Sequence, residues 1–139
     1  MNFESLSDIA SYIVSDGKGI LAADESNPTC TKRFDSIGVD STEDNRRDYR
    51  ELLFRSDGMK GNIGGVILFD ETIRQKAADG TPLVDVITAQ GSLPGIKVDK
   101  GLQPIGNTEE NITQGLDGLN ERLEEYYELG AKFTKWRAV

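Results

Sequence analysis

Short apolar runs alternate along the chain with stretches in which apolar residues recur at helical spacing. The runs begin at Ile20, Val66, Ile96 and Phe133, at intervals of roughly 30 residues or more that each hold a helical pattern. Such spacing is typical of successive β/α units in a parallel sheet. The run over residues 63–69 is apolar at consecutive positions, as expected for a strand buried on both faces. The pattern therefore predicts an α/β fold.

Capping residues place the helices of the first half. Residues 5–8 resemble a capping box that starts a helix, and Gly17 is placed to end it. Asn27 and Pro28 are expected as the N-cap and first residue of a second helix, whose start can hold an anion. A third helix is expected from residues 41–44 onward. The apolar positions expected to pack are Leu6, Ile9, Ala10 and Ile13 in the first helix and Tyr49, Leu52 and Leu53 in the third, with Arg46, Arg47 and Arg50 on the other faces.

The second half is expected to hold a strand over 96–99, a Gly/Asn/Thr-rich loop over 102–113 and a last strand over 131–139. The helix between the loop and the last strand is expected to be lined by Leu116, Leu119, Leu123 and Tyr127.

Two of the predicted strands carry charges where a core strand carries none. Because successive side chains of a strand point to opposite faces, Lys97 and Asp99 share one face and Ile96 and Val98 share the other. The last strand repeats this anomaly with two bases on one face, Lys135 and Arg137. An edge strand with a solvated face, or structural ion pairs, is the alternative explanation.

Four charged residues fall at the carboxyl ends of the predicted strands, where functional groups collect in parallel α/β folds: Asp24, Asp70, Asp99 and Arg137. If Asp24, Lys97, Asp99, Lys135 and Arg137 line one pocket, three bases face two acids, which suits an anionic substrate. Close ammonium groups also depress one another's pKa, which makes a lysine a better nucleophile or proton carrier.

Composition narrows the function classes. The net charge of −8 argues against a nucleic-acid partner. Without any histidine, Ser-His-Asp and Cys-His catalysis and the usual zinc sites are excluded. No apolar run is long enough to span a membrane and no segment resembles a signal peptide, so a cytoplasmic protein is expected.

Four β/α units cannot close a barrel of eight. We therefore expect residues 1–139 to form a single incomplete domain, the N-terminal half of such a barrel.

Six segments, in this order, resemble the N-terminal portion of the class I fructose-bisphosphate aldolases. They lie at residues 17–26, 43–47, 64–72, 95–101, 113–119 and 135–137 and extend over almost the whole chain. The resemblance implies a TIM (β/α)8 barrel, of which this chain holds about the first four units as a half-barrel. It also implies reversible cleavage of fructose 1,6-bisphosphate to dihydroxyacetone phosphate and glyceraldehyde 3-phosphate in glycolysis. The family needs no metal or other cofactor, because a lysine forms a Schiff base with the C2 ketone.

Site residues follow from the same resemblance. Asp24 and Lys135 resemble the groups that assist imine formation and proton transfer. The substrate-binding residues are expected to be Ser26, Thr29, Arg33, Arg46, Lys97 and Arg137. Thr29 stands where the family commonly has a serine. Arg137, with Asp99, is also expected to hold the charged network in place.

In the family, the imine-forming lysine lies on a later strand, so this chain alone is expected to be inactive. The full-length family enzyme is usually a homotetramer acting on a phosphorylated sugar, with no nucleic-acid or membrane partner. One alternative is a non-catalytic fragment that binds a phosphorylated ligand or a protein partner. Another is a stand-alone lyase that uses Lys97 or Lys135 for the imine.

Overall fold

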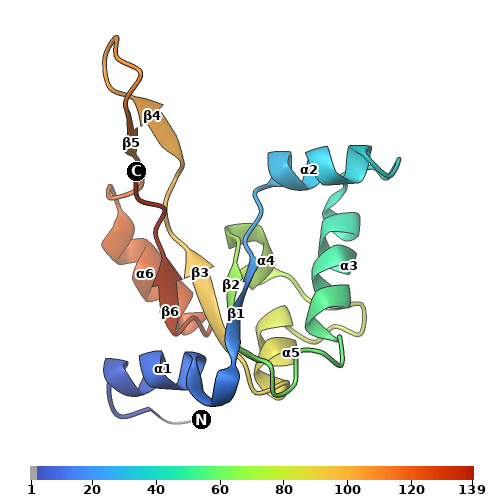
Figure 1. Cartoon of the computed structure of the whole chain (residues 1–139). Helices are drawn as coiled ribbons and strands as arrows, with labels where there is room; N and C mark the ends of the chain where they lie inside the picture. Colours follow the sequence, from blue (N-terminus) through green and yellow to red (C-terminus); the bar gives the residue numbers. More distant parts are fainter. Residues whose placement is uncertain (1–2) are drawn as a thin grey trace.

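The computed structural model describes residues 3–139 and is built around one four-stranded parallel sheet (Figure 1). The sheet has the order β1-β2-β3-β6, with every neighbouring pair parallel. The strands are β1 (Gly19–Ala23), β2 (Ile63–Leu68), β3 (Leu93–Lys97) and β6 (Phe133–Lys135). This confirms the predicted parallel α/β arrangement.

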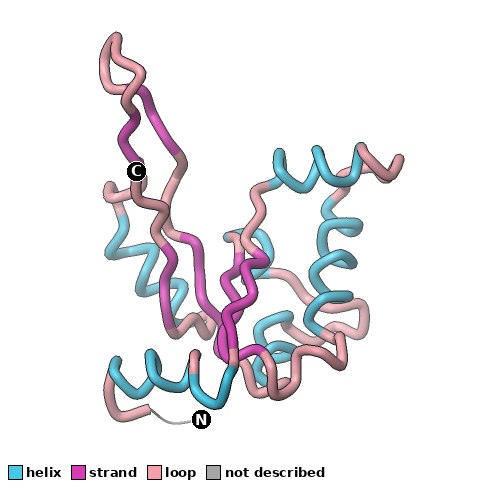
Figure 2. Tube along the Cα trace, viewed as in Figure 1, coloured by secondary structure: helices cyan, strands magenta, loops and turns pink. Residues whose placement is uncertain are grey.

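Helices connect the successive strands of the sheet (Figure 2). They are α2 (Asn27–Asp35), α3 (Glu43–Phe54), α4 (Asp70–Arg74), α5 (Leu83–Ala89) and α6 (Leu119–Glu128). Helix α1 (Leu6–Ile13) and the 3-10 turn η1 (Ser15–Gly17) precede the first strand. Among residues 3–139, none of these helices has the length and apolar character that a membrane crossing requires.

The hydrophobic core lies between the sheet and its helices. Val66, Leu68 and Ile96 are completely buried on the helix side of the sheet. They belong to the same core cluster as Leu83 and Ile87 of α5. On the opposite side, at the register position next to the buried residues, Ala22 is exposed and Ile67 is half-buried. The sheet thus has one covered and one open face.

The predicted third strand begins three residues too late. β3 starts at Leu93 and contains Pro94 and Gly95, which precede the predicted start at Ile96. Proline has no N–H to donate, but the Pro94 carbonyl accepts a hydrogen bond from the Lys132 amide at 2.8 Å. One remaining ladder bond is enough to keep this residue in the sheet.

Helix α1 lies beneath the amino ends of the strands (Figure 1) and keeps its predicted capping box between Ser5 and Asp8. Its predicted apolar face is wrong over most of its length, because only the last turn touches the sheet. Ile13 is buried, whereas Leu6 is 83% exposed. Tyr12 fixes this end by donating a hydrogen bond to the Gly91 carbonyl at 2.6 Å.

Glycines in β2 and β3 leave space for side chains and backbone that pack at the amino end of the sheet. A Cβ on Gly95 would lie 2.5–2.6 Å from ring atoms of Phe133, and a Cβ on Gly65 would lie 2.9 Å from the same ring. A Cβ on Gly64 would lie 2.6 Å from the backbone carbonyl carbon of Ile13. The ring of Phe133 therefore occupies the volume that two side chains would fill.

In helix α3 the predicted buried stripe is only partly right: Leu53 packs against the core, but Leu52 does not. Arg50 is only 2% exposed, whereas Leu52 is 72% exposed. Polar residues are ordinarily assigned to the solvent side, but here Glu25 reaches across and pairs with the arginine, which makes its burial possible.

Two further predictions in the second half need correction. The expected loop contains a short antiparallel hairpin, β4 (Leu102–Pro104) with β5 (Asn111–Thr113), that projects away from the sheet (Figure 1). In α6 the buried aromatic residue is Tyr126 and not Tyr127, which is 68% exposed. The Tyr126 hydroxyl reaches Asp70, so a polar partner rather than apolar periodicity selects the buried ring.

Candidate active site

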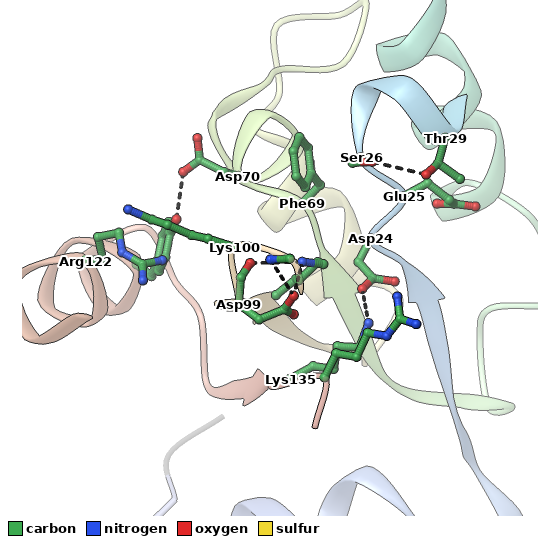
Figure 3. A pocket seen from close by; sticks show the side chains of 14 residues that line it. Asp24, Glu25, Ser26, Thr29, Phe69, Asp70, Asp99, Lys100, Arg122 and Lys135 are labelled. Atoms are coloured by element: carbon green, nitrogen blue, oxygen red, sulfur yellow. Dashed lines mark hydrogen bonds and ion pairs between the residues drawn. The ribbon is translucent and has the colours of Figure 1, made fainter. Parts of the chain in front are cut away.

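A pocket of about 750 Å³ opens at the carboxyl ends of the four parallel strands (Figure 3). Six of the eight predicted site residues line it: Asp24, Ser26, Thr29, Lys97, Lys135 and Arg137. They lie at or directly after the ends of β1, β3 and β6 and at the start of α2, so the sheet brings together residues that are far apart in the chain. The pocket lining holds five basic and four acidic side chains, which suits an anionic ligand.

Asp24 and Lys135 form an ion pair across the pocket, with Nζ 2.7 Å from Oδ2. Asp24 directly follows β1 and Lys135 is the last residue of β6, and these are the two outermost strands of the sheet. Neighbouring strands lie about 4.8 Å apart, so in a flat sheet these two would be separated by about 14 Å, farther than the two side chains reach together. The contact therefore requires the sheet to curve around the pocket.

Lys97 is held by the residue two positions further along. Its ammonium group donates to Asp99 Oδ1 at 2.7 Å and to the Asp99 carbonyl at 2.9 Å. The carboxylate also accepts from the Gly101 amide at 3.3 Å. Burial raises the pKa of the Asp99 carboxyl, but the hydrogen bond and charge of Lys97 outweigh this, so the pKa lies below its ordinary value. Asp99 is thus a charged anchor for Lys97.

Two hydroxyls stand at the start of α2. Ser26 Oγ and Thr29 Oγ1 lie 3.1 Å apart. Ser26, and not Asn27 as predicted, is the N-cap, yet its side chain makes no capping hydrogen bond, so the two paired hydroxyls face the pocket and not the helix backbone. The Thr29 amide donates to the Ser26 carbonyl at 2.9 Å, which keeps the two hydroxyls on the same turn.

Two predicted site residues lie outside the pocket lining. Arg33, whose side chain is 56% exposed, pairs with Glu25 and donates to the Tyr49 hydroxyl at 3.1 Å. Arg46 makes a bidentate pair with Glu71, at 2.8 and 2.7 Å. Both arginines therefore have acidic partners of their own in this structure.

Several residues of the pocket lack a predicted role. Asp70 accepts a hydrogen bond from the Tyr126 hydroxyl at 2.9 Å (Figure 3). Burial raises the pKa of Asp70, but hydrogen bonds from Arg74 and Tyr126 outweigh it and hold the pKa below its ordinary value. Arg122 donates to the Val98 carbonyl at 3.0 Å and to the carbonyl of Gly115. Only Asp70 had a sequence signal, its place directly after a buried strand.

Metal binding has no evident site here: among residues 3–139 no three acidic or cysteine side chains are grouped so that they could hold a metal ion.

Comparison with known proteins identifies the family of this pocket. Residues 5–139 match the family model described as fructose-bisphosphate aldolase class-I. A probable class 1 fructose-bisphosphate aldolase of Xanthomonas axonopodis pv. citri is 56% identical over 140 residues, and fructose-bisphosphate aldolase 1 of Toxoplasma gondii is 56% identical over 137. These matches cover 100% and 98% of this chain, but 42% and 38% of the two relatives.

A solved structure of the Plasmodium falciparum aldolase, in complex with TRAP and a small-molecule inhibitor, superposes with a TM-score of 0.93 at 53% identity. The superposition covers 96% of this chain and 39% of that one. The chain therefore spans about two fifths of the length of the relatives it matches.

Proposed function

The chain belongs to the class I fructose-bisphosphate aldolase family, and we propose that it supplies the phosphate-binding and proton-transfer part of an enzyme that cleaves fructose 1,6-bisphosphate reversibly. Its fold is that of the TIM-barrel aldolases, present here as a half-barrel. The proposed products are dihydroxyacetone phosphate and glyceraldehyde 3-phosphate. Residues 1–139 are proposed to be one incomplete domain of that enzyme.

The observation that carries the proposal is the Asp24–Lys135 pair facing the same pocket as Lys97. An ammonium group 2.7 Å from a carboxylate can pass a proton to a leaving hydroxyl and be restored by a neighbouring acid. Imine formation at a ketone requires the loss of one water molecule, so it needs such a proton donor. Asp24 and Lys135 are proposed to assist that step beside the imine-forming lysine.

Neither Lys97 nor Lys135 is proposed as the imine-forming lysine. Each ammonium group is ion-paired at 2.7 Å, with Asp99 and Asp24 respectively, and a nucleophilic amine must be unprotonated. The family resemblance implies that the reacting lysine lies on a later strand. The isolated chain is therefore proposed to be inactive.

The far phosphate of the substrate is proposed to bind to the hydroxyls of Ser26 and Thr29 and to Lys97, with Arg137 beside them. Charged and hydroxyl donors of this kind form the strongest hydrogen bonds to phosphate. Arg33 joins them if the phosphate replaces its exposed contact with Glu25. A substrate contact by Arg46 requires its pair with Glu71 to open.

The full-length enzyme is proposed to be a cytoplasmic homotetramer, as the family resemblance implies. Among the relatives, the Arabidopsis thaliana aldolase 6 is described as cytosolic and an aldolase of Chlamydomonas reinhardtii as chloroplastic.

The first test asks where the imine forms. The purified chain is incubated with dihydroxyacetone phosphate and reduced with borohydride, and its intact mass is measured by mass spectrometry. No adduct is expected. An adduct mapped to Lys97 or Lys135 would instead support the stand-alone lyase.

The second test completes the chain. Residues 1–139 are joined to the remaining C-terminal part of the Xanthomonas axonopodis relative, and cleavage of fructose 1,6-bisphosphate is measured. Activity is expected. A folded product that binds phosphate but cleaves nothing would favour the alternative, a non-catalytic module for phosphorylated ligands.

A further inference from the structure

A second ionic cluster lies at the edge of the pocket and extends between helices α2 and α3. Its centre is Glu25, which lines the pocket and accepts hydrogen bonds from Arg33, Arg50 and the Tyr49 hydroxyl. Arg33 is largely exposed, but Arg50 is only 2% exposed and does not line the pocket. A buried guanidinium costs much desolvation free energy, so its contacts indicate what it is kept for.

Arg50 donates three hydrogen bonds, all to the segment from Glu25 to Cys30. Nη1 donates to the Glu25 carboxylate, and Nη2 donates to the Glu25 carbonyl at 2.8 Å. Nη2 also lies 3.7 Å from Cys30 Sγ. The planar guanidinium fixes the directions of its donors, so a single side chain sets both the side chain and the backbone of Glu25.

The held segment is the one that carries the pocket's hydroxyls. Ser26 follows directly after Glu25, and Thr29 directly precedes Cys30. The contacts of Arg50 therefore bracket Ser26 and Thr29 from behind, while their side chains line the pocket in front. Asp24, which pairs with Lys135, is the residue immediately before the segment.

We propose that Arg50 is a positioning residue: by gripping Glu25 and Cys30 from behind, it holds the Ser26 and Thr29 hydroxyls ready for a phosphate group. It touches no substrate itself. The phosphate part of this inference rests on the proposed function, whereas the grip on the segment does not.

Electrostatics support the arrangement. Burial raises the pKa of the Glu25 carboxyl, but the hydrogen bond from Arg50 and the charges of Arg50 and Arg33 outweigh it, so the pKa lies below its ordinary value. Glu25 thus stays ionised at neutral pH, and the grip persists there. The ring of Tyr49 lies 5.2 Å from the guanidinium and closes off one side of it.

The test compares three variants of the 139-residue chain. Arg50→Met keeps most of the side-chain volume and removes all hydrogen-bond donors. Arg50→Lys keeps the positive charge but loses the planar guanidinium with its fixed donor directions. Arg55→Met is the matched control, because Arg55 lies on the same helix and pairs with two carboxylates, Glu51 and Asp79, but is 43% exposed and away from the pocket.

Two readouts come from one set of amide NMR spectra: hydrogen exchange at the amides of Thr29 and Cys30, and titration with inorganic phosphate. Arg50→Met is expected to speed exchange and to weaken phosphate binding at least about tenfold, since several backbone residues must then be ordered on binding. Arg50→Lys is expected to lie between Arg50→Met and the unaltered chain, and Arg55→Met to match the unaltered chain. Unchanged spectra for the β2 and β3 amides show that the core remains folded. If Arg50→Met unfolds, the comparison of Arg50→Lys with Arg55→Met decides.

Either of two results would overturn the inference. One is exchange in both Arg50 variants equal to that of the control. The other is faster exchange with phosphate affinity unchanged, which would make Arg50 merely structural. If the unaltered chain binds no phosphate, the proposed phosphate site fails, while exchange at Thr29 and Cys30 still decides whether Arg50 grips the segment.

Discussion

The two ends of the sheet's open face are built in opposite ways. At the amino end, the ring of Phe133 lies over Gly65 and Gly95, so that side of the strands is filled by one aromatic group. Two residues further along the same strands, the register pairs Lys97 with Lys135, and the face becomes charged. Neutral, closely packed atoms give way to ammonium groups within one pleat repeat.

The difference separates stability from chemistry. At the amino end, packing volume limits which side chains fit, because a methyl group added under the Phe133 ring has no room. At the carboxyl end, charge determines what can bind, because each of the two ammonium groups has one carboxylate partner and faces a pocket. Substitutions at the amino end should therefore change the free energy of unfolding, and substitutions at the carboxyl end should change binding and turnover.

The largest effect is expected from Lys135→Met in the chain completed with the remaining part of the Xanthomonas axonopodis relative. Losing the proposed proton carrier should lower kcat for fructose 1,6-bisphosphate cleavage by about 10²–10⁴. The free energy of unfolding should change by about 1 kcal/mol or less, since the side chain is one third exposed. Lys132→Met is the matched control, because Lys132 precedes the same strand but lies against the ring of Tyr127. Equal kcat in both variants would remove Lys135 from the mechanism.

Gly95→Ala is the next largest and acts at the other end. Its new methyl would meet the Phe133 ring at 2.5–2.6 Å, so the free energy of unfolding should fall by about 1–3 kcal/mol in a urea titration. Gly19→Ala is the control, because nothing lies within 4 Å of that position. Adding Phe133→Leu to Gly95→Ala should recover part of the loss. A fully tolerated Gly95→Ala would contradict the role of volume here.

Acid should weaken the ionic contacts at the carboxyl end and leave the packing around Phe133 unchanged. The pKa values of Glu25, Asp70, Glu71 and Asp99 all lie below their ordinary values in the fold. Their contribution to stability is therefore present at neutral pH and is lost as the pH falls through the folded-state pKa values, from about pH 5 downward. The loss caused by Gly95→Ala should stay the same across that range, because it arises from overlap between a methyl group and an uncharged ring. Urea titrations at several pH values measure both; a pH-independent stability would contradict this assignment.

The smallest effect is expected from Thr29→Ser. The hydroxyl near Ser26 is kept and only a methyl group is lost, so the affinity for inorganic phosphate should change by about threefold or less. Thr29→Val, which keeps the shape and loses the hydroxyl, should weaken binding by about tenfold or more. Amide NMR titration compares the two. Equal affinities would show that the hydroxyl does not contact the phosphate.

Much of the sheet and pocket could be predicted from the sequence. The strand period placed Lys97 on one face with Asp99 and Lys135 on one face with Arg137, and the structure places these side chains in one pocket. The contact of Asp24 with Lys135 could not be predicted, because it depends on how strongly the sheet curves.

Two of the misses share one physical cause, which is that a polar partner overrode apolar periodicity. Arg50 is buried because Glu25 reaches it, and Tyr126 is buried because its hydroxyl finds Asp70. Neither partner is near in sequence, so no local pattern carries the information. The place of Arg46, which is held by the distant Glu71, was hidden in the same way.

The ion pair between Asp24 and Lys135 also has a kinetic consequence, because it joins residues 111 positions apart in the chain. Such a contact closes a very long loop, whose entropy must be lost before the contact returns any free energy. Both outer strands need β2 and β3 between them first, so the pair forms late in folding. Removing it should leave the folding rate almost unchanged and speed unfolding, which corresponds to a φ-value near zero. The pair that completes the pocket then serves as a latch on a sheet that is already assembled.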